Sequence, residues 1–187
     1  MILVLLISVQ ALAGGLDKPR IVVLEVDPGP TGIHFRAGLT PEYCMGQMEE
    51  LQQGGVLRFE YLAKLVEERG WWADREVSRM VIVHKVEYDP LAKTYRIIQR
   101  SIAGKDVTMT QESDRMCRLM SSIEGDLEWS DRDRGENPYH LEIKSVVHRS
   151  TLPDAIKYLL FFIRWDRHTG WSRSDGFRRP SEQEPRP

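Results

Sequence analysis

Val56-Leu57-Arg58-Phe59-Glu60-Tyr61 and the later run MVIVHKVEY, from Met80 to Tyr88, decide the fold of this chain. Apolar or aromatic residues take every second position of the first stretch, and Met80, Ile82, His84, Val86 and Tyr88 take every second position of the second. Successive side chains of a β-strand point to opposite faces, so this period predicts strands with one buried face. Such a pattern is typical of an antiparallel sheet with one wetter side.

Further strand candidates lie on both sides of these stretches. Residues 20–26 and 32–39 flank the turn-forming sequence DPGPT, which predicts a hairpin. Residues 94–98 resume the alternation after Asp89-Pro90, and residues 139–147 alternate again. We therefore expect an antiparallel sheet of about five strands, drawn from pieces near residues 20, 33, 57, 82, 96 and 141.

Helical spacing predicts three helices, mostly on one face of the sheet, and hence an α+β fold. The first begins at Thr40-Pro41 and ends before Gly54-Gly55. Thr110 is the expected N-cap of the second, which ends near Gly125 and carries the apolar stripe Met116, Leu119, Met120 and Ile123. The third opens at residues 151–154, and its run 158–163 is apolar nearly all round, as in a central core helix or an interaction surface.

The two ends of the chain differ in composition from its middle. Residues 1–13 form an uncharged apolar run that ends in Ala11-Leu12-Ala13, which predicts a signal peptide, although no Lys or Arg precedes Lys18. The alternatives are a buried N-terminal strand or helix and a retained anchor. We expect one α+β domain over residues 19–175, no membrane span in the mature chain, and a disordered polar, proline-rich tail over residues 177–187.

Charge and motifs give no sign of nucleic-acid or metal chemistry. The 187 residues carry 26 Lys and Arg against 28 Asp and Glu, a net charge of -2, so nucleic-acid binding is not expected. We recognise no nucleophile motif, no phosphate-binding glycine loop and no metal-ligand spacing, and so expect no catalytic, cofactor or metal residues. His140 and His148 would lie about 26 Å apart on one strand. His34 and His84 could meet across a sheet, although partly buried histidines with hydrogen-bond partners are the simpler interpretation.

The aromatic pair Trp71-Trp72, close to Asp74 and Arg75, is the strongest candidate for a contact site. Tryptophan is enriched at ligand and protein contacts. The competing interpretation is core packing of one ring and partial exposure of the other, with Trp72 at least half buried and Asp74 capping a turn or pairing with a nearby arginine. Possible partner-contact residues are therefore Trp71, Trp72 and Asp74.

The chain has two cysteines, Cys44 and Cys117, each near the apolar face of an expected helix. An even number of cysteines in an exported chain makes a disulfide possible. Burial as two separate small apolar side chains explains the same positions.

Several short pieces, taken in order, resemble a known bacterial family, domain of unknown function 4390. They are Gly55-Val56-Leu57-Arg58-Phe59, Trp72-Ala73-Asp74 after Arg69, Tyr88 and Tyr95 bracketing a turn, Leu152-Pro153, and Trp165 with Trp171. The resemblance covers about residues 19–175 and implies a signal-bearing, single-domain extracytoplasmic protein with no established activity. Family genes often neighbour membrane histidine kinases, which implies an envelope partner such as a sensor kinase. The chain departs from the family in lacking a basic N-terminal region and in having Met116-Cys117 where a small residue is more usual.

Two functional hypotheses follow from these observations. The first is a non-enzymatic interaction or sensory accessory module outside the cytoplasmic membrane. The second is an extracytoplasmic enzyme, such as a hydrolase, whose catalytic residues converge from distant strands.

Overall fold

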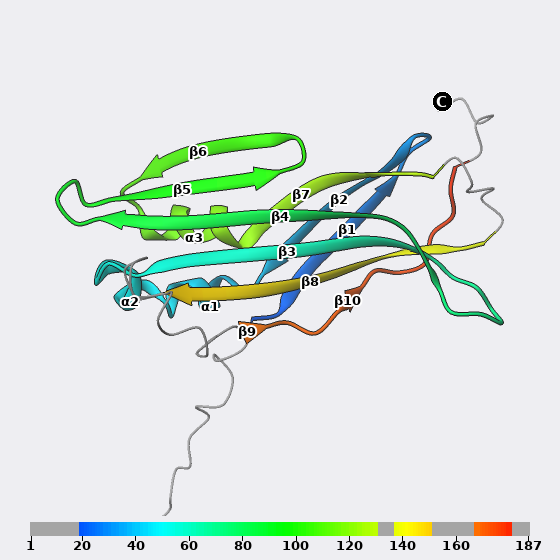
Figure 1. The fold of residues 1–187 in the computed structure, drawn as a ribbon, viewed down its shortest axis with the longest axis horizontal. Coiled ribbons are helices and arrows are strands. Elements are labelled where there is room, and N and C mark those ends of the chain that lie inside the picture. Colours follow the sequence, from blue (N-terminus) through cyan, green and yellow to red (C-terminus); the bar gives the residue numbers. More distant parts are fainter. Residues whose placement is uncertain (1–18, 131–136, 151–166, 181–187) are drawn as a thin grey trace, which may run out of the picture.

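The computed structural model describes residues 19–130, 137–150 and 167–180, which form two antiparallel sheets (Figure 1). The larger sheet has the strand order β10-β8-β3-β4-β5-β6, with β9 paired to β8, and the smaller sheet has the order β1-β2-β7. The larger sheet contains β3 (Val56–Glu67), β4 (Arg75–Asp89), β5 (Thr94–Ser101), β6 (Gly104–Thr110), β8 (Tyr139–Ser150), β9 (Arg167–His168) and β10 (Ser172–Arg173).

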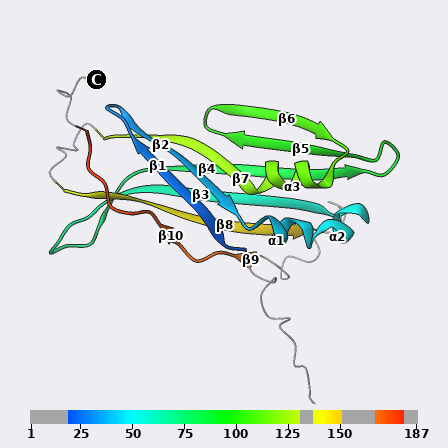
Figure 2. The ribbon, with the colours of Figure 1, turned by 180° about the vertical axis from the view of Figure 1, so that it is seen from behind.

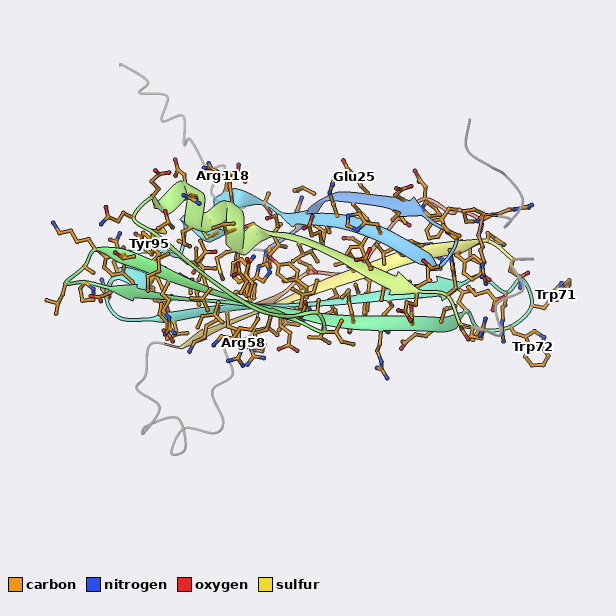
Figure 3. The ribbon with its side chains drawn as sticks, turned by 90° about the horizontal axis from the view of Figure 1, so that it is seen from above. Glu25, Arg58, Trp71, Trp72, Tyr95 and Arg118 are labelled. Carbon is orange, nitrogen blue, oxygen red and sulfur yellow. A yellow bond between two sulfur atoms is a disulfide. The ribbon has the colours of Figure 1, made fainter. Side chains whose placement is uncertain are left out.

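The smaller sheet contains β1 (Ile21–Pro28), β2 (Gly32–Leu39) and β7 (Ser122–Glu128). β1 and β2 form the predicted hairpin. The smaller sheet and the helix α3 (Ser113–Ser121) lie on one face of the larger sheet, as Figure 3 shows from above. The short helices α1 (Pro41–Met45) and α2 (Met48–Gln52) follow β2, and Figure 2 shows them from behind.

The core lies between the two sheets. β3 contributes the alternating buried residues Leu57, Phe59 and Tyr61, whereas Arg58 and Glu60 lie on the outer face and pair with each other at 3.0 Å. From β4, Met80, Ile82, His84 and Val86 are buried on the inner side, as the alternation predicted. The smaller sheet closes the core with Ile33, Phe35, Ala37, Leu39, Ile123 and Leu127.

The α+β class and the antiparallel pairing are confirmed, but the single sheet of about five strands was too small. The strands β6 and β7 and the two-residue strands β9 and β10 were missed. Ile123 continues the helical spacing of Met116, Leu119 and Met120, so the pattern extended the predicted helix to residues where β7 lies. Thr110 ends β6 instead of capping α3, and its hydroxyl accepts the backbone N–H of Glu112.

The first predicted helix is divided into α1 and α2 at Gly46-Gln47. The predicted signal peptide over residues 1–13 and the third predicted helix lie outside the described residues. The tail expected to be disordered from residue 177 instead begins with a residue that is held in place. Phe177 forms an antiparallel bridge with Tyr139 and packs near Trp129.

No helix in the described part of the chain is both long and apolar enough to cross a membrane.

Cys44 and Cys117 form a disulfide, with their Cα atoms 5.5 Å apart. The bond links α1 to α3, so the interpretation of two separate buried thiols is wrong. α1 and α3 are adjacent in space although 73 residues separate the two cysteines in sequence. The disulfide therefore closes a long loop that includes β3 to β6.

Replacing both cysteines by serine should lower the free energy of unfolding by about 4 kcal/mol, because in the chain-entropy model this loop restricts the unfolded chain strongly. Denaturant unfolding of the double variant and of the oxidised protein measures the difference. Thiol labelling of denatured, unreduced protein should detect no reactive thiol. Two thiols per chain would contradict the bond.

Candidate functional site

Trp71 and Trp72 lie at the tip of the β3–β4 hairpin, at one end of the molecule (Figure 3). Their side chains are 94% and 82% exposed, so the prediction that Trp72 is at least half buried is wrong. The reason is the strand register. Pairing of β3 with β4 ends at Glu67 and Arg75, and the smaller sheet does not extend over the turn between them.

Glu67, directly below the tip, holds the two strands together. Its side chain is only 9% exposed and accepts hydrogen bonds from Arg75 at 2.6 Å, from Asn137 at 3.0 Å and from Arg69 at 3.2 Å. Burial raises the pKa of this carboxyl, but the bonds from Asn137, Arg75 and Arg69 outweigh burial, and the pKa is lowered overall. Glu67 therefore remains charged and acts as the anchor of the turn.

The turn itself is closed by two further hydrogen bonds. The Asp74 carboxylate accepts the backbone N–H of Arg69 at 3.1 Å, and the N–H of Trp72 donates to the carbonyl of Arg69 at 3.2 Å. The predicted role of Asp74 as a turn cap is confirmed. Asp74 thus shapes the tip, and the two indoles are presented to solvent on a supported backbone.

The anchor was missed at the sequence level, although a signal for it was present. Glu67 continues the inward-facing series of β3 that runs through Leu57, Tyr61 and Leu65, and it is the charged residue in that series. A carboxylate at a buried strand position needs partners of opposite charge. Arg69 and Arg75 are near in sequence, whereas Asn137 is 70 positions away and reaches Glu67 because it lies just before β8, the strand paired with β3.

A second candidate is a groove of about 760 Å³ between the two sheets, beside the β5–β6 turn. His84, Gln99, Leu119 and Ile123 are among the residues that line it. Nδ1 of His84 is 3.1 Å from the Met120 carbonyl oxygen, and the Gln99 amide lies 3.3 Å from Nε2 and donates to the Leu119 carbonyl. Both ring nitrogens therefore have structural partners.

These contacts satisfy the carbonyl groups at the end of α3. The Tyr61 hydroxyl also donates to the Met120 carbonyl, at 2.7 Å. Helices leave their last carbonyls without partners inside the helix, and here β3, β4 and β5 supply donors. Burial lowers the pKa of His84, although its bonds to backbone carbonyls oppose this shift. A neutral His84 that donates from Nδ1 therefore joins the helix to the larger sheet.

The remaining described histidines are dispersed. His34 lies in the smaller sheet, 3.0 Å from Asp126, and so does not meet His84 across one sheet. His140 lies 3.3 Å from Glu68 and 3.4 Å from Glu142. Within residues 19–130, 137–150 and 167–180, no group of three His, Cys, Asp or Glu side chains could hold a metal ion.

Acidification should destabilise the protein through His84. Its pKa is lower in the folded state than in the unfolded state, so the unfolded chain binds more protons as pH falls below about 6.5. The contribution of neutral His84 to stability is present above that pH and is lost progressively below it. Chemical unfolding from pH 7.5 to 5 should show a smaller loss for His84→Gln than for the unaltered protein. Parallel curves would contradict this assignment.

Trp71→Ala and Trp72→Ala should each change the free energy of unfolding by less than about 0.5 kcal/mol, because neither ring is packed in the core. The matched control is Trp129→Ala. Trp129 is 8% exposed, and its indole N–H donates to the Gly29 carbonyl at 2.9 Å, so its truncation should cost about 3 kcal/mol or more. Thermal and denaturant unfolding distinguish truncation of an exposed ring from truncation of a buried one. A large loss for Trp72→Ala would mean that this ring is packed.

Comparison with known proteins agrees with the resemblance found in the sequence. The family model for a domain of unknown function, DUF4390, matches residues 17–175. The matched region contains the tip, its anchor and the groove. Neither curated proteins nor solved structures give a match. By the extent of the family match, the chain belongs to the DUF4390 family.

Proposed function

We propose that this protein is a non-enzymatic interaction or sensory accessory module that works outside the cytoplasmic membrane and contacts its partner through Trp71 and Trp72. The observation that carries the proposal is the near-complete exposure of both rings on a hairpin tip that Glu67 and Asp74 hold in shape. Exposing two large apolar rings to water is unfavourable unless a partner covers them.

Two features support a location outside the cytoplasmic membrane. Residues 1–13 have the apolar run and the Ala-Leu-Ala ending of a secretory signal. The Cys44–Cys117 disulfide is of a kind that persists in oxidising compartments and is rare in the cytosol. We therefore propose a periplasmic or otherwise extracytoplasmic protein.

The chemistry of the tip defines the surface that would recognise it. Each indole offers a flat apolar face and one N–H donor, which fit an apolar pocket with a hydrogen-bond acceptor at its rim. Because the tip is already shaped by its own bonds, little ordering is needed on binding. The extracytoplasmic part of a membrane sensor kinase, to which the family resemblance points, is the proposed partner.

The alternative of a hydrolase is less well supported. Its site would be the groove, where His84 is the candidate base. Its ring nitrogens already contact the Met120 carbonyl and the Gln99 amide, so His84 would have to leave its structural role to accept a proton from a substrate. No specific observation favours that second function.

The double variant Trp71→Ala/Trp72→Ala should reduce affinity for the extracytoplasmic domain of a neighbouring sensor kinase at least 10-fold, as loss of aromatic contact residues does. Leu91→Ala is the matched control. Leu91 is 96% exposed and lies in the β4–β5 turn, at the end of β4 opposite to the tryptophan tip. Calorimetric titration of each folded variant measures the effect. Equal affinity for both variants and the unaltered protein would refute the proposed contact.

A further inference from the structure

The strand β6 forms one edge of the larger sheet. In the part of the chain that the structure describes, β6 pairs with β5 alone and is the last strand in the sheet order. Figures 1 and 2 show no other described element beyond it. This edge is distinct from the tryptophan tip, which lies at the end of β3 and β4.

The hairpin turn determines which backbone groups of β6 point outward. Ser101 and Gly104 are register partners on either side of a two-residue turn, so they form the hydrogen-bonded pair that closes it. Hydrogen-bonded and non-bonded pairs alternate along antiparallel strands. The backbone N–H and C=O groups of Lys105, Val107 and Met109 therefore face away from β5.

Apolar side chains accompany these outward-facing backbone groups. Val107 is 42% exposed and Met109 is 65% exposed. Ile98, the register partner of Val107, lies on the same face. An edge strand with free backbone groups and apolar side chains is a template for pairing with another strand.

We propose that β6 pairs antiparallel with β6 of a second copy of this chain, about a two-fold axis that passes through Val107. This register uses all three outward-facing residues of both copies. It places Val107 opposite Val107, and Lys105 opposite Met109 of the other copy, so that the aliphatic stem of the lysine covers the thioether. The register is self-complementary, as an interface between two identical surfaces requires.

Charge also favours a second copy as the occupant of this edge. On the opposite face of the strand, the same register places Asp106 opposite Thr108, a neutral residue whose hydroxyl donates to Asp106 of its own chain at 3.4 Å. No charged residue of β6 lies opposite a like charge, which would oppose strand pairing. Two seven-stranded sheets would thereby join into one continuous sheet.

Cysteine crosslinking tests the register directly. The two native cysteines are joined to each other, so Val107→Cys introduces one free thiol per chain. In a hydrogen-bonded antiparallel pair the facing Cα atoms are about 5.5 Å apart, a separation that a disulfide can span. Mild oxidation of Val107→Cys should convert most of the protein to a covalent dimer.

Met109→Cys is the matched control for this experiment, because Met109 is also exposed on the same face of β6. In the dimer, the Cα atoms at position 109 of the two copies would lie about 13 Å apart along the strands, too far for a disulfide. Monomer after oxidation of Val107→Cys, or equal crosslinking of both variants, would overturn the proposal.

Sedimentation measurements test the interface without a crosslink. The unaltered protein should form a dimer whose fraction rises with concentration. Val107→Pro removes the outward N–H, which an edge strand tolerates, and should raise the dimer dissociation constant at least 10-fold. Val107→Thr keeps that N–H and should still dimerise.

A monomer at every concentration, or a dimer that Val107→Pro does not weaken, would overturn pairing through β6. If the proline variant does not fold, the cysteine variants decide the matter. These measurements involve no kinase, so their failure leaves the proposed function of the tryptophan tip unaffected.

Discussion

The fold depends on the pairing of β3 with β4 on one side and β8 on the other. The ladder with β8 runs without a break from Val56 to Glu67, and the ladder with β4 has one irregularity between Leu65 and Val66. A shift of one residue would turn the inner face of β3 outward, since side chains alternate along a strand. This register buries Phe59 and Tyr61 and brings Glu67 level with Arg75.

Polar bonds and apolar packing attach the second layer to this sheet, and a disulfide joins two of the helices to each other. The Cys44–Cys117 disulfide joins α1 to α3, and Tyr61, His84 and Gln99 bond the last carbonyls of α3 to the sheet. Buried polar groups of this kind are costly when unpaired, so they fix one arrangement of the helix over the strands.

The alternation of apolar and polar residues predicted those strands in which one face is apolar and the other is charged. β3, β4 and β8 were found for this reason. β7 was not found, because Ile123 fits the helical spacing of the residues before it as well as the buried face of a strand. β6 was missed because only Val107 and Met109 alternate as apolar residues in it, and two positions are too short a pattern to predict a strand.

The candidate site was predicted in part. Trp71 and Trp72 were identified from residue type alone, and Asp74 from its turn-forming position. Their exposure could not be predicted, because it depends on where the ladder ends and on what covers the turn. Nor could the bond from Asn137 to Glu67 be predicted, since it joins residues 70 positions apart.

We propose that Trp71 and Trp72, at the tip of the β3–β4 hairpin, contact a partner protein. Site-specific photocrosslinking in the bacterial envelope tests it most directly, with a photoreactive residue at position 71 or, as a control, at position 91. We predict one discrete adduct with the sensor kinase from position 71 and none from position 91. The absence of an adduct at position 71, or the same adducts from both positions, would contradict the account.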